Sequence, residues 1–222
     1  MKEIGGYFEL ELLFGEEYHK NAIRLNSCRN AFEYILRAKA YRKVFLPYYT
    51  CDVMLEPVRK LNLTFEFYNI DENFYPLFDF DKIASHDVFV YNNYFGVCDK
   101  QIELVSTKVK NLIIDNSQAF YALPLHDVDT FYSPRKFFGL PDGAYLYTDT
   151  FLNETYEQDM SWQRFEHLIG RIDLGAESFY KIFRQNDESL INQPIKKMSK
   201  LTQKLLSSID YKLIANHICF LS

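Results

Sequence analysis

The sequence predicts an α/β fold in which a mostly parallel sheet is flanked by helices and followed by a helical C-terminal extension. Short runs rich in β-branched and aromatic residues alternate with helical patterns from about residue 22 to residue 149, which is typical of βαβ units. Hydrophobic residues make up 48% of the 222 residues, which is enough apolar material for a substantial core. After residue 149 the strand-like runs stop and helical periodicity takes over.

The strands expected in this region are short and are bounded by turn residues. They are residues 44–49, 64–70, 87–94, 111–115, 128–132 and 144–148.

The helices expected between the strands carry apolar residues at helical spacing. Residues 30–39 are the clearest case, and residues 53–61 and 101–109 show shorter versions of the pattern. The apolar face of the first helix is formed by Ala31, Tyr34, Ile35 and Ala38. The crossovers between parallel strands are expected to be right-handed.

The region after residue 149 divides into four parts. Residues 154–163 are polar, residues 165–183 predict a helix, residues 186–194 predict a loop or linker, and residues 199–220 predict one long final helix. The apolar positions of the final helix are Leu201, Leu205, Leu206, Ile209 and Leu213. We therefore expect an α/β domain at residues 1–150 and, at residues 151–222, a helical extension that opens a truncated C-terminal domain.

Charge and composition exclude several function classes. With 25 Lys and Arg against 30 Asp and Glu, the net charge of −5 offers no positive field for nucleic acid. No apolar run reaches the roughly 18 residues of a membrane span, and the N-terminus does not resemble a signal peptide, so we expect a cytoplasmic protein without membrane contact. The four cysteines and five histidines lack metal-ligand spacing, so no metal ion is expected.

Three segments are expected to lie at the carboxyl ends of strands, where open parallel sheets bind ligands. Residues 25–31 lead into a helix whose free backbone N–H groups could bind an anion, although plain N-capping by Asn26 or Ser27 explains the same pattern. Residues 112–119 place Asp115 at the end of an apolar strand, where it either faces a cationic partner or caps the next turn.

The third segment, residues 131–144, contains Lys136 between arginine and two phenylalanines. Apolar surroundings lower the pKa of an amine and make it a usable nucleophile toward a carbonyl carbon. The alternative is a surface lysine that keeps its amine in water.

Four motifs occur in a fixed order along the first 150 residues. They are Asn-Ser-Cys-Arg-Asn-Ala at 26–31, Asp-x-x-Gln-Ala at 115–119, Ser-x-x-Lys at 133–136 and Asp-Gly-Ala at 142–144. Residues 4–10 (Ile-Gly-Gly-Tyr-Phe-Glu-Leu), 47–51 (Pro-Tyr-Tyr-Thr-Cys) and 94–96 (Tyr-Phe-Gly) add further landmarks. This order and spacing resembles the DegT/StrS family of sugar aminotransferases, which are pyridoxal 5'-phosphate (PLP) enzymes of fold type I.

The resemblance implies a role for each matching residue. Lys136 matches the lysine that binds PLP covalently, and Asp115 matches the carboxylate that pairs with the pyridinium nitrogen. Gln118 matches the side chain beside the cofactor ring. The backbone amides of Arg29 and Asn30 match the helix start that holds the phosphate, and Ser133 is a further hydrogen-bond donor in this comparison.

One position departs from the family pattern. Cys51 stands where many members have an aromatic residue that stacks on the cofactor ring, so Tyr49 or Tyr94 would have to replace it. The resemblance implies an aminotransferase that moves an amino group from an amino acid such as glutamate to a keto sugar, nucleotide-linked in the family, and that works as a homodimer. The alternative is a truncated, non-catalytic homologue that keeps the fold and weak PLP binding, because family members continue into a smaller C-terminal domain.

Overall fold

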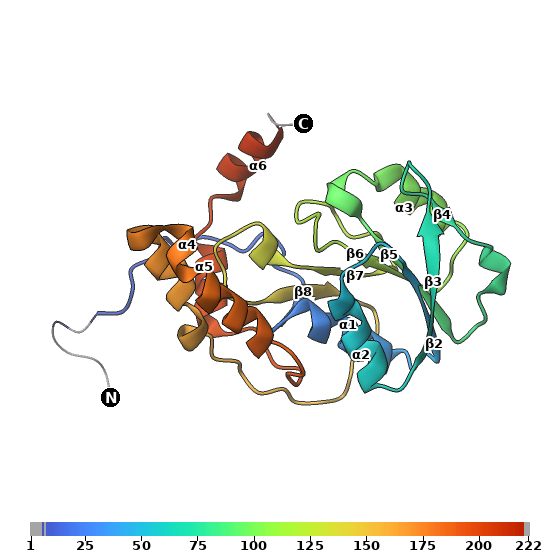
Figure 1. Ribbon diagram of the computed structural model, residues 1–222, viewed down its shortest axis with the longest axis horizontal. Coiled ribbons are helices and arrows are strands. Elements are labelled where there is room, and N and C mark those ends of the chain that lie inside the picture. Colours follow the sequence, from blue (N-terminus) through green and yellow to red (C-terminus); the bar gives the residue numbers. More distant parts are fainter. Residues whose placement is uncertain (1–5, 7, 220–222) are drawn as a thin grey trace.

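An eight-stranded mixed sheet forms the centre of the computed structural model, which describes residue 6 and residues 8–219 (Figure 1). The strands are β1 (Ile23–Leu25), β2 (Lys43–Pro47), β3 (Thr64–Ile70), β4 (Pro76–Leu77), β5 (Asp87–Asn92), β6 (Leu112–Asp115), β7 (Asp129–Tyr132) and β8 (Ala144–Tyr147). Their order is β1-β8-β7-β6-β5-β2-β3-β4. The run from β3 to β7 is parallel, whereas β4, β8 and β1 each pair antiparallel with their neighbours.

The α/β class predicted from the sequence is confirmed, and every predicted strand is present. β3 has the predicted bounds, and the other five agree within two residues at each end. β1 and β4, which are three and two residues long, were not predicted from the sequence. Such short strands show no measurable alternation of side chains, so they are found only through their partners in the sheet.

Helices cover both faces of the sheet. They are α1 (Cys28–Ala38), α2 (Leu55–Lys60), α3 (Asp99–Ser106), α4 (Glu166–Ser189), α5 (Lys200–Ser207) and α6 (Tyr211–Cys219). Alternate residues of β5 show the two faces, because Val88 and Val90 pack in the cluster under α1 and α2, whereas Phe89 and Tyr91 pack in the cluster under α3. All four side chains are fully buried, so the sheet is the middle layer of three.

The prediction of one continuous helix over residues 199–220 is wrong, because two separate helices, α5 and α6, occupy this region. The Ser208 hydroxyl donates to the Leu205 carbonyl at 2.7 Å, and the Asp210 carboxylate accepts the Leu213 backbone N–H at 3.0 Å, so a new helix begins there. Figure 1 shows α6 projecting away from the sheet. The predicted continuous apolar stripe is therefore absent from the described part of these helices, and Phe220 lies outside the described residues.

The segment between α4 and α5 lies against the sheet. Lys197 forms isolated bridges with Leu25 of β1 and with Gln158. The loop predicted at residues 186–194 is shorter than expected, because α4 continues to Ser189. No helix among the described residues combines the length and apolar character needed to cross a bilayer.

His19 is buried among aromatic rings on the face of β7 and β8 opposite α1. Its Nε2 lies 2.8 Å from the Phe120 carbonyl, and its Nδ1 lies 3.1 Å from the Tyr147 hydroxyl. A neutral ring satisfies both contacts by donating from Nε2 and accepting at Nδ1. Burial lowers the pKa of His19 from 6.5 to about 4, against the opposing effect of the Phe120 hydrogen bond.

This lowered pKa predicts a loss of stability in acid. Below pH 6.5 the unfolded chain binds a proton at His19 and the folded chain does not, so the free energy of unfolding should fall by about 3 kcal/mol between pH 6.5 and pH 4. Urea unfolding at several pH values, compared with a His19→Gln variant that keeps a donor but does not titrate, isolates this contribution. Equal pH slopes in the two proteins would contradict it.

Candidate active site

Polar side chains gather where the parallel strands end. Asn92, the last residue of β5, is in register with Asp115, the last residue of β6, and Asp115 is in register with Phe131 of β7. Thr50 follows β2, and its hydroxyl accepts a hydrogen bond from the Asn92 amide at 3.0 Å. This carboxyl edge is where ligands of open α/β sheets bind.

Asp115 is a buried acid at the centre of this edge. It is 9% exposed, and its carboxylate accepts the Ser117 backbone N–H at 2.7 Å. Burial raises the pKa of Asp115, while the Ser117 hydrogen bonds and the charge of Lys136 act in the opposite direction. Within the described residues no lysine, arginine or histidine lies within 4.0 Å of this carboxylate as an ion-pair partner. The site therefore holds an acid that would gain from a bound cation.

Lys136 is exposed and sits on a 3₁₀ turn, Pro134–Lys136, directly after β7. The turn begins at Ser133, which is 5% exposed and whose carbonyl accepts the Lys136 backbone N–H at 3.2 Å. The positive charge of Lys136 acts on the carboxylate of Asp115 and on the thiol of Cys28. Lys136 therefore lies within electrostatic reach of the end of β6, at Asp115, and of the start of α1, at Cys28.

Cys28 joins the start of α1 to the ends of β6 and β7. Its thiol donates to the Tyr132 carbonyl at 3.1 Å and accepts from the Ser117 hydroxyl at 3.7 Å. Burial and the nearby charge of Asp115 raise the pKa of Cys28 to about 11, so the thiol is protonated and inert at neutral pH. The positive end of the α1 dipole therefore lies beside the two charged residues of the site.

The start of α1 is capped by Ser27, whose hydroxyl oxygen accepts the Asn30 backbone N–H at 3.3 Å. This is the capping alternative considered from the sequence, and it engages one of the two amides expected to hold phosphate. The N–H groups of Cys28 and Arg29 belong to the first helical turn, which has no intrahelical acceptors. Among the described residues the N–H groups of Cys28 and Arg29 have no acceptor, whereas the Asn30 N–H, one of the expected pair, already donates to Ser27.

The side chains of Arg29 and Asn30 point to other parts of the chain. The Arg29 guanidinium is buried 3.4 Å from the Glu56 carboxylate, and its Nη1 has no hydrogen-bond partner among the described residues. The Asn30 amide donates to the Gln193 carbonyl at 2.9 Å. These side chains therefore join α1 to α2 and to the segment after α4.

Of the two tyrosines expected to replace the stacking aromatic residue, one is exposed and one is buried. Tyr49 is 60% exposed and stacks on Tyr94 with ring centroids 5.5 Å apart, and the Tyr94 hydroxyl donates to the Tyr49 carbonyl. Tyr94 is buried in the core, so Tyr49 is the exposed ring of the pair. Cys51 is exposed at the start of the turn that leads to α2.

Gln118 lies on the exposed rim of the site. Its side-chain oxygen accepts the Phe95 backbone N–H at 3.3 Å. Phe95 has a φ of 55°, a left-handed conformation that is uncommon for a bulky residue, and the Gln118 contact helps to hold it. The Gln118 side chain is exposed, and its amide nitrogen has no hydrogen-bond partner within the described part of the chain.

Four residues at the carboxyl edge were not predicted as part of the site: Thr50, Cys28, Asn92 and Ser117. Asn92 is 9% exposed, and its Oδ1 is buried without a partner in the described part of the chain. Two consecutive asparagines at the end of an apolar strand were the available signal for this position. Cys28 and Ser117 lie inside motifs that were noted for neighbouring residues.

These features fit PLP in three respects. The buried carboxylate of Asp115 has no ion-pair partner among the described residues, and the first turn of α1 offers backbone N–H groups to a phosphate. Lys136 presents an exposed amine whose charge reaches Asp115 and Cys28. Buried polar atoms without partners on Asn92 and Arg29 add capacity for further hydrogen bonds. Within the described residues no group of three or more His, Cys, Asp or Glu side chains is arranged to hold a metal ion.

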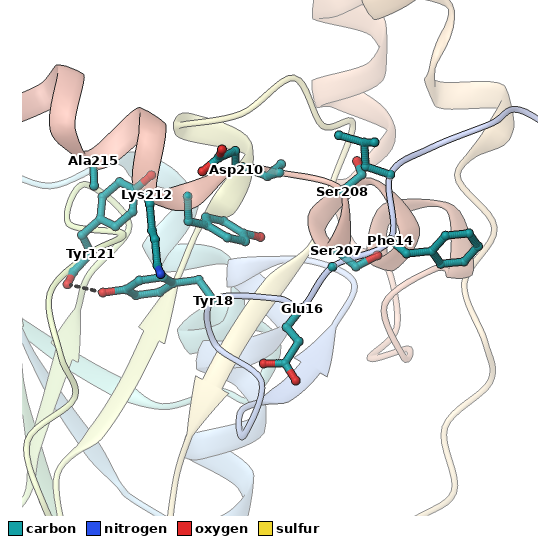
Figure 2. Close-up of a pocket in the computed structure, with 13 residues that line it drawn as sticks. Phe14, Glu16, Tyr18, Tyr121, Ser207, Ser208, Asp210, Lys212 and Ala215 are labelled. Atoms are coloured by element: carbon teal, nitrogen blue, oxygen red, sulfur yellow. Dashed lines mark hydrogen bonds between the residues drawn. The ribbon is translucent and has the colours of Figure 1, made fainter.

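A separate groove of about 630 Å³ lies between the N-terminal segment and the turn from α5 to α6. Figure 2 shows Tyr18 reaching across it to donate to the Tyr121 carbonyl at 3.3 Å, with Phe14 at one end and Lys212 beside Tyr121. Its walls are mainly apolar, and they do not include Lys136 or Asp115. The groove is therefore distinct from the polar cluster at the carboxyl edge.

Searches with the sequence found no matching protein-family model and no matching curated protein. Comparison of the structure with solved structures did find matches. DesV of S. venezuelae, solved with a ketimine intermediate, superimposes with a TM-score of 0.52 and 15% identity, covering 89% of this chain and 52% of DesV. A PLP-bound protein assigned as an aminotransferase from Clostridium difficile 630 superimposes with a TM-score of 0.53 and 14% sequence identity, covering 90% of this chain and 53% of that chain.

The histidinol-phosphate aminotransferase of Clostridium acetobutylicum gives a TM-score of 0.52 at 12% identity, covering 89% of this chain and 57% of that chain. The chain thus spans about half the length of the solved structures it matches. At these identities the likeness shows the fold. The mixed sheet with flanking helices is that of the fold type I PLP-dependent transferases.

Proposed function

We propose that this chain binds PLP and provides the cofactor-binding part of an aminotransferase of the DegT/StrS type. The observation that carries the proposal is the buried carboxylate of Asp115, which has no ion-pair partner among the described residues and lies within electrostatic reach of Lys136. A protonated pyridine nitrogen is the cation that this position would stabilise. The matching fold supports the same cofactor.

Each residue at the carboxyl edge has a separate proposed role. Asp115 would hold a proton at the cofactor's ring nitrogen, and the first turn of α1 with Ser133 would bind its phosphate. When bound, PLP supplies an electron sink for a carbanion at the substrate's α-carbon. The Lys136 amine would attach the cofactor and, once released, would move a proton from the substrate α-carbon to the C4′ carbon of the cofactor.

The proposed substrates follow from the motif order that resembles the family. The amino donor is an amino acid such as glutamate, and the acceptor is a keto sugar of the nucleotide-linked class. Tyr49 would be the aromatic residue nearest the cofactor ring, because it is exposed beside the site and Cys51 offers no ring.

The test is to titrate the purified chain with PLP and record the visible spectrum, then add glutamate. A band that appears with PLP and is lost with glutamate supports amino transfer to the cofactor. A band that glutamate leaves unchanged supports the alternative of a non-catalytic homologue that binds PLP. No band at saturating PLP would refute both versions.

We expect the chain to form a homodimer through the carboxyl edge. Exposed apolar side chains lie around the site, including Tyr48 at 72%, Phe95 at 62% and Val97 at 67% exposure. Light scattering at tens of micromolar, a typical range for such association, should give twice the 26.4 kDa chain mass. Val97→Asp should favour the monomer, and Leu77→Asp on β4 should not. A monomer before any substitution would refute the dimer.

A further inference from the structure

The loop that carries Lys136, residues 133–143, has little regular structure of its own. Beyond the 3₁₀ turn Pro134–Lys136, it runs without a helix or strand until β8 begins. A reactive lysine needs a fixed position, and a loop of this kind can supply one only if other parts of the chain hold it. We call residues 133–143 the lysine loop.

The strongest anchor of the lysine loop is Asp142, which is fully buried. Its Oδ2 accepts the Arg164 Nε–H at 2.9 Å, and its Oδ1 accepts the Thr202 hydroxyl at 2.6 Å. Arg164 also pairs with Asp159, and Lys196 lies 3.8 Å from Asp159. The two negative charges of Asp142 and Asp159 are therefore matched by the two positive charges of Arg164 and Lys196. A buried carboxylate is tolerated when its charge is paired in this way.

Two further contacts come from the last turn of α4. The Asn186 amide donates to the Pro141 carbonyl at 3.1 Å and is itself 6% exposed. The Arg135 guanidinium pairs with the Asp187 carboxylate at 2.7 Å. Arg135 directly precedes Lys136, so the Asp187 contact holds the lysine loop next to the lysine. The Asn186 contact holds the loop near its other end, at Pro141.

The same part of the chain also holds the start of α1. Asn26, which lies just before the cap of α1, donates through its amide to the Pro194 carbonyl at 3.0 Å and accepts the Lys196 backbone N–H at 3.1 Å. The Asn26 carbonyl in turn accepts the Gly143 backbone N–H at 2.8 Å. The segment of residues 186–202 thus contacts both the lysine loop and the chain just before α1.

Gly143 shows how close this contact is. Its φ is +101°, and a Cβ at this position would lie 2.9 Å from the Thr202 methyl carbon. Only glycine adopts this backbone conformation readily while allowing α5 to approach the lysine loop. The close contact between Thr202 and the turn that leads into β8 therefore depends on glycine at position 143.

We propose that residues 186–202 form a clamp that fixes the lysine loop against the start of α1, with Asn186 and Thr202 as positioning residues for Lys136. The proposal deepens the proposed function and rests on it for the role of Lys136. The clamp acts through the loop backbone and Asp142.

Amide hydrogen exchange of the cofactor-free chain tests the clamp. The reporters are the hydrogen-bonded amides of Lys136, Phe137, Phe138, Leu140 and Gly143. Thr202→Val keeps the side-chain shape and removes the donor to Asp142, so exchange at these amides should rise about tenfold. Thr202→Ser keeps the hydroxyl and should restore slow exchange. Lys200→Ala, an exposed position on the same helix, is the matched control and should leave exchange unchanged.

A second variant keeps the test open if Thr202→Val unfolds. Arg135→Gln removes only the partly exposed ion pair with Asp187, and it should raise exchange of the lysine loop about threefold. In PLP-loaded protein, the midpoint pH of the change in visible absorbance should differ from that of the unaltered chain in Thr202→Val and in Arg135→Gln. In Thr202→Ser it should equal that of the unaltered chain.

Unchanged exchange in the lysine loop of both Thr202→Val and Arg135→Gln would overturn the clamp. If the unaltered chain fails to bind PLP, the proposed function fails on that result alone. The exchange measurements still decide the clamp in that case, because they need no cofactor.

Discussion

Replacing Lys136 with alanine is expected to abolish the covalent retention of PLP and to lower amino transfer by about four orders of magnitude. The amine has two proposed tasks, attachment of the cofactor and movement of the proton at the substrate α-carbon, and alanine can perform neither. The side chain is exposed, so the free energy of unfolding should change by less than about 0.5 kcal/mol. Borohydride reduction followed by peptide mapping measures the attachment directly.

Lys110→Ala is the matched control for this experiment. Lys110 is also exposed, but it precedes β6 and so lies at the opposite edge of the sheet from Asp115. This variant should keep both the visible band and the pyridoxyl group on Lys136. A pyridoxyl group found on any other lysine of the unaltered chain would show that the residue was assigned incorrectly.

The fold was predictable because its central strands are buried on both faces. Continuous apolar runs such as Leu112, Ile113 and Ile114 of β6 can be recognised without knowledge of their neighbours. The break between α5 and α6 was not predicted, because the apolar spacing continues through it while Ser208 and Asp210 form local hydrogen bonds that end one helix and start the next.

The positions of Asp115 and Lys136 in the fold were easier to predict than the contacts around them. Asp115 and Lys136 each follow a strand, so topology alone places them at one edge. The partners of Arg29 and Asn30 could not be inferred, because the Arg29 guanidinium meets Glu56 of α2 and the Asn30 amide meets Gln193, which is 163 positions away. Such long-range contacts leave no periodic signal in the sequence.

Asp115→Asn is expected to weaken PLP binding by about one to two orders of magnitude, since a charge-assisted hydrogen bond becomes a neutral one. The same change should make the cofactor-free chain slightly more stable at neutral pH. Burial raises the pKa of Asp115, so its ionised form is disfavoured in the folded chain above the unfolded pKa. Asparagine removes that cost and can still accept the Ser117 backbone N–H.

Asp129→Asn provides the contrast, because Asp129 is another buried acid with a raised pKa that lies at the opposite end of the neighbouring strand. Its carboxylate is 3.0 Å from the Lys39 amine and lies away from the carboxyl edge, so Asp129→Asn should leave PLP affinity unchanged. PLP titration and urea unfolding of both variants measure the two effects separately. If Asp115→Asn bound PLP as tightly as the unaltered chain, or if Asp129→Asn lost affinity equally, the acid at the end of β6 would have no special role toward the cofactor.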